Sequence, residues 1–219
     1  MPNYVKNGGV WKEAKPYVKN NGMWKGVEEG FVKSGGVWKP YYASDKVIIE
    51  NASIGDFIFG GYFAGIIDST QVIGSSGIRY GLIVSEREYG EAREISYGLR
   101  EYDFSGVNTA WDGLSATISL VNDSHSTPAA NFCSNLNLNG YSDWYLPAKR
   151  ELEALFEYED SLNLQYPDYY WSSTEYDYSY AYCRSLMDNY TARIFKTSPN
   201  MKVVRCIRKK SSKNLTIDL

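Results

Sequence analysis

The stretch NLNGYSDWYLPAKRELEAL, residues 137–155, places an aromatic pair and a Leu-Pro dipeptide directly before a helical pattern. Pro147 starts a helix readily but cannot sit inside one, so we expect the helix to begin just after it. Leu152, Leu155 and Phe156 recur at helical spacing and form its predicted buried face. The remaining carboxylates are expected to form a solvated face without a matching base, and they are Glu151, Glu153, Glu157 and Glu159.

Two more helices are predicted upstream of this stretch. In residues 111–123, Leu114, Ile118 and Val121 fall at positions i, i+4 and i+7 and form one apolar stripe. In residues 126–140, Thr127 is a capping residue and Pro128 occupies the first helical position. The predicted buried face of that helix consists of Ala129, Phe132, Cys133 and Leu136.

Strands are predicted on both sides of these helices. Phe57, Phe59 and the pair Gly60-Gly61 indicate a strand, a tight turn and a second strand within residues 54–71. Residues 80–88 form another apolar strand, and residues 202–208 form the last one. Residues 89–106 are polar and without a pattern, so a loop is expected there. Helices and strands in this order predict an α+β fold.

The segment after the third helix is unusually rich in tyrosine. Seven of the seventeen positions in residues 166–182 are Tyr, with small polar residues between them. Tyr offers a large contact area with few torsions to freeze, which is typical of binding surfaces. Tyr176, Tyr178, Tyr180 and Tyr182 alternate with Asp177, Ser179 and Ala181, so in an extended strand they would share one face. By itself this alternation is also typical of tyrosines that pack a β-sheet.

The first 42 residues contain three copies of one motif: YVKNGGVWK at 4–12, YVKNNGMWK at 17–25 and FVKSGGVWK at 31–39. Each reads as a β-hairpin whose turn needs positive φ. A lone hairpin of this size is not stable, so we expect an attachment or oligomerisation module. The motif resembles short Trp-Lys repeats of phage virion proteins. A carbohydrate-binding repeat is the alternative, because Trp11, Trp24 and Trp38 could stack on sugars.

Charge and cysteine content exclude several functions. A net charge of −3 with both signs interspersed gives no footprint for nucleic acid or an acidic membrane. The chain starts without an apolar run, so we expect no secretory signal, no membrane insertion and synthesis in the cytosol. Cys133, Cys183 and Cys206 do not form a metal-binding pattern.

Residues 137–155, YWSSTE at 170–175 and VRCIR at 204–208 together resemble a bacterial and phage family. This is the C-type-lectin-like group that includes the C-terminal domain of the Legionella collagen-like protein and the variable proteins of diversity-generating retroelements. The resemblance covers residues 54–210 and implies that Trp144, Leu146, Leu152 and Trp171 are core. It also implies that Cys133 and Cys206 lie close together. Ala148 stands where a capping Ser or Thr is usual, at a cost of about 1 kcal/mol.

The same resemblance implies a hypervariable ligand-binding face near the C-terminus. Retroelement variation acts on adenines, often in AAC codons, which cannot become Trp, Met, Lys, Glu or Gln. Between residues 176 and 200 only Met187 and Lys196 fall outside the permitted set, and Lys196 resembles the family's fixed lysine. The predicted ligand-binding residues are Tyr176, Asp177, Tyr178, Ser179, Tyr180, Cys183, Ser185, Asp188, Tyr190, Arg193, Ile194 and Phe195.

Two alternatives to a variable receptor-binding protein remain. One is a calcium-dependent or aromatic-stacking lectin, although the usual sugar-site tripeptides are absent and YPD at 166–168 is the nearest match. The other is an enzyme of the formylglycine-generating fold, which needs a reactive cysteine pair. Cys183 and Cys206 have no flanking arrangement of a cation and a histidine that would activate them, and His125 lies in a polar loop.

We therefore expect residues 1–42 to form the repeat module and residues 43–219 a C-type-lectin-like domain of the α+β class. The expected role is that of a phage tail-fibre tip, or a related virion protein, that binds a bacterial surface protein or glycan. No enzymatic activity, cofactor or bound metal is expected. The expected partners also include other virion proteins and sister chains in a homo-oligomer, for which a trimer is expected because the resemblance is to tail-fibre tips. Several linked faces would gain avidity.

Overall fold

The computed structural model describes residues 4–211 except 8–9, 14–16, 21–22, 27–28, 35–36, 44, 69–78, 165–168 and 201, and up to residue 47 the description covers the backbone alone. The chain divides into two compact units, each of which is considered by itself. The first contains the repeats and helix α1 (Asp45–Asn51), and the second spans Ser53–Ser211. No helix in the described ranges combines the length and the apolar character that crossing a membrane requires.

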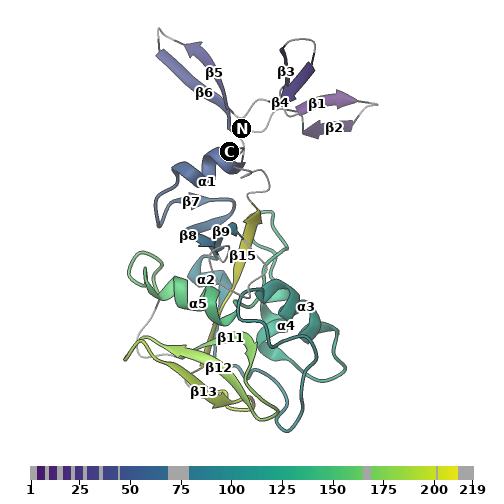
Figure 1. Cartoon of the computed structure of the whole chain (residues 1–219), viewed down its shortest axis with the longest axis vertical. Coiled ribbons are helices and arrows are strands. Elements are labelled where there is room, and N and C mark those ends of the chain that lie inside the picture. Colours follow the sequence, from purple (N-terminus) through teal and green to yellow (C-terminus); the bar gives the residue numbers. More distant parts are fainter. Residues whose placement is uncertain are drawn as a thin grey trace. The chain divides into compact units, whose positions relative to one another are not determined.

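Each repeat forms an antiparallel strand pair, as predicted (Figure 1). All three pairs have the same register, in which a Lys lies opposite a Trp. The paired residues are Lys6 and Trp11, Lys19 and Trp24, and Lys33 and Trp38. The predicted glycine turns at 8–9, 21–22 and 35–36 lie outside the described residues. The six strands are β1 (Tyr4–Asn7), β2 (Val10–Glu13), β3 (Tyr17–Asn20), β4 (Met23–Gly26), β5 (Glu29–Ser34) and β6 (Val37–Ala43).

The second unit contains two sheets. The first has the order β10 (Glu91–Arg93), β14 (Lys202–Arg205), β11 (Tyr169–Glu175), β12 (Tyr180–Ser185) and β13 (Thr191–Phe195). The second has the order β15 (Ile207–Ser211), β9 (Arg79–Val84), β8 (Gly61–Asp68) and β7 (Phe57–Ile58). Only Cys206 separates β14 from β15, so one continuous segment contributes a strand to each sheet.

The helices of this unit are α2 (Arg87–Gly90), α3 (Gly113–Asn122), α4 (Pro128–Ser134) and α5 (Lys149–Phe156). Helix α5 packs on β8, β11 and β12, and therefore reaches both sheets (Figure 1). Helix α3 packs on α4 and β11. The predicted α+β class is confirmed.

The core residues predicted from the resemblance are all buried: Trp144, Leu146, Leu152 and Trp171 are at most 2% exposed. The indole N–H of Trp171 donates to the carbonyl oxygen of Ile95 at 2.8 Å. The predicted turn between β7 and β8 is also present, with Phe59 and Gly60 at φ of 49° and 82°. A Cβ on Gly60 would lie 2.4 Å from the Tyr141 ring, so this turn requires glycine for space as well as conformation.

The predicted apolar stripe of α3 is wrong. Ile118 is 52% exposed, and the buried residues of α3 are Gly113, Ala116, Thr117 and Leu120. The helix approaches the segment before α5 so closely that a Cβ on Gly113 would lie 2.5 Å from the Ala148 nitrogen. Small residues permit this approach, and hydrophobic spacing alone does not detect them.

Part of the segment predicted as a loop is structured. Within residues 89–106, β10 pairs antiparallel with β14, with Glu91 opposite Arg205. The guanidinium of Arg205 is buried, lies 3.2 Å from the Glu91 carboxylate and donates to the carbonyl oxygen of Ser85. This strand is held by long-range polar contacts, and for that reason it has no apolar pattern in the sequence.

The assignment of Glu151 to a solvated face is also wrong, because its side chain is fully buried. Its carboxylate accepts hydrogen bonds from the hydroxyl groups of Tyr80 and Tyr145 and from the backbone N–H groups of Ala148 and Gly113. Burial raises the pKa of Glu151, and the bonds from Tyr80, Ala148 and Tyr145 oppose that rise. Glu151 also supplies half of a capping box, although Ala148 has no side-chain oxygen.

Candidate ligand-binding face

Strand β12 alternates strictly between two environments. Tyr180, Tyr182 and Arg184 are half-buried, whereas Ala181, Cys183 and Ser185 are buried. The half-buried side chains pair across the strand with Phe195, Arg193 and Thr191 of β13, so both strands direct these residues to the same side of the sheet. We call Tyr176, Tyr180, Tyr182, Arg193 and Phe195 the tyrosine face.

The aromatic rings of this face contact one another. Tyr176 packs edge-on against Tyr182, with centroids 5.4 Å apart, and Tyr180 stacks on Phe195 at 4.5 Å. Tyr176 comes from the loop between β11 and β12, so the expectation of one extended tyrosine strand holds only from Tyr180 onward. The loop is shaped by Asp177, whose carboxylate accepts the N–H groups of Ser179 and Tyr180, both at 2.8 Å.

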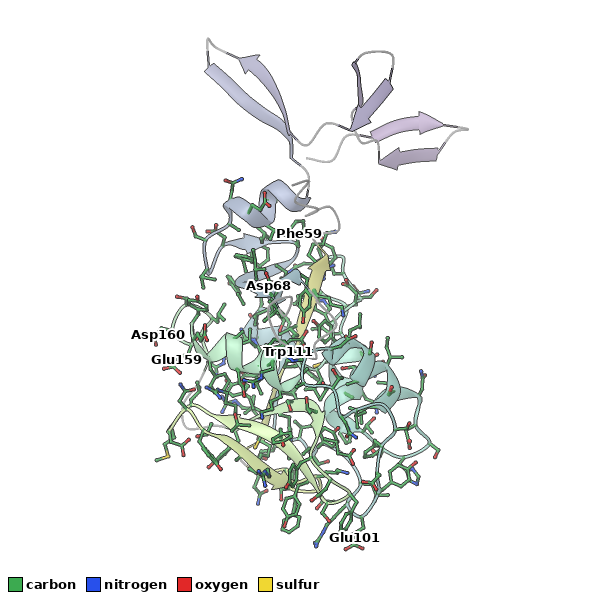
Figure 2. All side chains as sticks on the ribbon, in the orientation of Figure 1. Phe59, Asp68, Glu101, Trp111, Glu159 and Asp160 are labelled. Atoms are coloured by element: carbon green, nitrogen blue, oxygen red, sulfur yellow. The ribbon has the colours of Figure 1, made fainter. Side chains whose placement is uncertain are left out.

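Three cations cover rings of the tyrosine face. The Arg193 guanidinium lies 4.1 Å from the centroid of Tyr176 and donates to its hydroxyl oxygen at 2.9 Å. Lys149 Nζ lies 4.5 Å from the Tyr182 centroid, and the Arg100 guanidinium lies 4.3 Å from the Phe195 centroid. Arg100 belongs to the loop that also carries Glu101, which projects away from the ribbon in Figure 2. Cation–π contacts of this kind contribute about 0.5–1 kcal/mol each at exposed sites.

A buried ion pair supports the face from beneath. Lys196 Nζ lies 2.7 Å from a carboxylate oxygen of Glu175 and donates to the carbonyl oxygen of Tyr102. The other carboxylate oxygen of Glu175 accepts the N–H of Phe104. The N–H of Lys196 donates to the carbonyl oxygen of Ser179. Both ends of the tyrosine loop and the loop carrying Arg100 are therefore tied to one pair.

The structure exposes part of the predicted residue set and buries the rest. Tyr176, Tyr178, Asp188, Tyr190 and Arg193 are exposed, with Tyr178 at 55% and Tyr190 at 63%. The half-buried residues are Asp177, Tyr180, Ile194 and Phe195. Ser179, Cys183 and Ser185 are buried, so in this conformation their side chains do not reach a ligand on the surface. Tyr178 and Tyr190 lie beyond opposite ends of β12.

Four residues at or near the face are absent from the predicted ligand-binding set, although Tyr182 was expected to share one side of the strand with Tyr180. Tyr182 and Arg184 follow from the alternation along β12 once that strand is located. Arg100 and Lys149 come from a loop and from the start of α5, and only the tertiary structure brings them to the rings. No local signal in the sequence identifies them.

The cysteines are buried free thiols. Cys133 and Cys206 share a hydrogen bond, so their expected proximity is confirmed; burial is the main cause that raises the pKa of Cys133. Burial also raises the pKa of Cys183 to about 12. Within the described residues no group of three or more His, Cys, Asp or Glu side chains is placed to hold a metal ion. The tripeptide at 166–168 lies outside the described residues.

The fold and face define the class of the second unit: an α+β domain that presents a tyrosine-rich surface above the buried ion pair of Glu175 and Lys196. Residues 100–208 match the family model of the Lcl C-terminal domain, and this range contains α3 to α5 and the whole tyrosine face. The match supports the resemblance to the Legionella collagen-like C-terminal family. No curated protein matches the chain.

Proposed function

We propose that this chain is a receptor-binding protein, a phage tail-fibre tip or a related virion protein, that binds a bacterial surface protein or glycan through the tyrosine face. The observation that carries the proposal is the alternation along β12 between half-buried Tyr and Arg side chains on one side and a buried row on the other, with the exposed Arg193 of β13 opposite Tyr182. Interface energy concentrates in such Tyr and Arg residues. The Lcl C-terminal match suggests a surface or binding-related family.

We further propose a C-type-lectin-like domain whose face varies as in retroelement variable proteins. The position of Lys196 supports this idea. It is one of two residues between 176 and 200 that AAC-derived codons cannot encode, and it is buried and ion-paired beneath the face. A fixed residue is expected where variation would break the support. A near-identical template repeat and a reverse-transcriptase gene beside this gene are the sequencing result that tests the proposal.

We propose a non-catalytic role for the same domain. Burial of Cys183 keeps its thiol protonated at neutral pH, since its pKa is raised to about 12. A thiol in that state is a poor nucleophile. Recognition then depends on the shape and charge of the face.

The binding test uses labelled full chain on a panel of bacterial strains. Once a bound strain is found, the double substitution Tyr176→Ala and Tyr178→Ala should reduce cell binding at least about tenfold. Its thermal midpoint should stay nearly unchanged because both rings are exposed, Tyr176 at 43% and Tyr178 at 55%. The matched control is Tyr89→Ala, because Tyr89 is 52% exposed and lies outside the face. Equal binding by the double variant and wild type would exclude the part of the tyrosine face at Tyr176, together with the adjoining Tyr178, as the receptor site.

A further inference from the structure

Two cations at the tyrosine face, Lys149 and Arg193, have no ion-pair partner among the described residues, although the whole chain has a net charge of −3. Among the described residues, neither Lys149 nor Arg193 has a carboxylate within ion-pair distance, and each instead covers an aromatic ring. The carboxylates closest to the tyrosine stretch in the chain have other partners: Asp177 accepts two backbone N–H groups, and Asp188 accepts the N–H of Tyr190. In the Arg100 loop, the exposed Glu101 lies 3.8 Å from Arg100. The face therefore offers two cations that lack an anionic partner.

The ring faces that a sugar would use are partly occupied by this chain itself. Tyr180 and Arg100 both cover the ring of Phe195, at 4.5 Å and 4.3 Å from its centroid. Arg193 covers Tyr176, and Lys149 covers Tyr182. Stacking of a sugar or a nucleic-acid base needs an open ring face, whereas hydrogen bonding to a Tyr hydroxyl does not.

Phenol hydroxyls complete the chemistry of the surface. In the described part of the chain no hydrogen bond involves the hydroxyl groups of Tyr178, Tyr180, Tyr182 or Tyr190, which leaves them available as donors. Tyr178 and Tyr190 flank β12, whose six residues span about 20 Å. A surface of that length matches the extent of one side of a protein–protein interface better than the size of a single sugar ring.

Building on the proposed function, we infer that the ligand of the tyrosine face is an acidic protein surface, whose Asp and Glu carboxylates pair with Arg193 and Lys149 and accept hydrogen bonds from the tyrosine hydroxyls. The cation–π contacts hold both cations in place before binding, which lowers the entropy lost when the carboxylates dock. The inference goes beyond the proposed function by giving the receptor surface a negative charge and by assigning it to protein.

The test selects randomised dodecapeptides on immobilised full chain and measures the affinity of the selected peptides. We expect enrichment of Asp and Glu over the starting library, and weaker binding at high salt. Arg193→Gln and Lys149→Gln should each weaken these peptides about tenfold. Arg150→Gln is the matched control: it removes the same charge one position along α5, from a residue already 2.7 Å from Glu153, and should change affinity less than about twofold.

Three results would overturn the inference: neutral or basic selected peptides, an equal loss in Arg150→Gln, or Arg193-dependent binding of heparin without acidic enrichment. The last would assign the site to an anionic glycan, and neutral dextran serves as its uncharged control. Ligands that lose affinity with Tyr176→Ala but not with Arg193→Gln or Lys149→Gln would leave the proposed function intact and remove this inference. Selected ligands that are insensitive to all three substitutions would remove the proposed function itself. Circular dichroism melting of each variant checks that the fold is retained.

Discussion

The ammonium group of Lys196 lies 2.7 Å from a carboxylate oxygen of Glu175, and neither side chain is more than 2% exposed. This ion pair joins the end of β11 to the residue just after β13, and it holds the loop between β10 and α3 that contains Arg100. Burying two charges is costly, so removing one partner leaves the other uncompensated. The arrangement of the tyrosine face thus depends on a contact that is not part of its surface.

Lys196→Met should lower the free energy of unfolding by about 3–5 kcal/mol, because it leaves the Glu175 carboxylate buried without its cation. Urea unfolding measures the loss. Adding Glu175→Gln should recover part of it, since the amide oxygen still accepts the N–H of Phe104. Independent, additive effects of the two substitutions would show that the pair is not coupled.

Glu151→Gln should destabilise the domain by about 2–3 kcal/mol, because the amide puts a donor among four groups that all donate to this position. Glu153→Gln on the same helix is the comparison. Its carboxylate pairs with an Arg150 side chain that is 51% exposed, so less than about 1 kcal/mol is expected. Thermal and urea unfolding of both variants measure the two losses in stability. Equal losses would mean that the Glu151 side chain is solvated.

These glutamates show how far sequence reasoning reached. Leu152, Leu155 and Phe156 were placed correctly, since helical spacing reports which side of α5 meets the core. The same spacing assigned Glu151 to water, because a polar residue enters a core only when donors arrive from elsewhere, here Tyr80 and Tyr145. Such donors come together only in the folded chain.

The candidate face divides in the same way. Its aromatic content and its place after residue 175 were predictable, because the local excess of tyrosine that includes Tyr176 and Tyr178 is visible in the sequence. Arg100 and Lys149 were not, since each is far from the tyrosine stretch in sequence and local patterns do not encode tertiary contacts. Cys183 and Ser185 are buried because alternate residues of a strand point to opposite sides of the sheet. Predicting which side is buried requires knowing the residue at which β12 begins.

Alkaline pH should unfold the domain. Burial raises the pKa of Tyr80, Tyr97 and Tyr145 above the ordinary value of 10.0. With the folded pKa above the unfolded one, the unfolded state binds fewer protons above pH 10, so stability is complete below that pH and falls as pH rises. Urea midpoints at stepped pH values, with phenolate absorbance, measure the decline.

Tyr97→Phe is the variant that isolates one of these groups. It removes a titrating hydroxyl that donates to the carbonyl oxygen of Ser173 at 2.9 Å, at a cost of about 1 kcal/mol at neutral pH. Its stability should fall less steeply with pH than that of the wild type. Identical slopes would mean that Tyr97 ionises in the folded state as readily as in the unfolded one.

The three N-terminal hairpins should drive self-association, because isolated two-stranded hairpins are not stable on their own. A trimer is the oligomer that we expect. Light scattering at micromolar concentration should give a multiple of the chain mass for the full chain and a smaller species for a chain that starts at Pro40. If both run as monomers, docking of the repeats onto another virion protein or a glycan becomes the better explanation.

The alternation along β12 has a consequence for how related chains can diverge. Substitutions at Tyr180, Tyr182 or Arg184 change the partly accessible side of the sheet, whereas substitutions at Ala181 or Cys183 change the buried side. If the proposed variation of the face occurs, neighbouring codons in one short strand would be under different constraints. Related chains could then differ in their targets while sharing the buried row of β12.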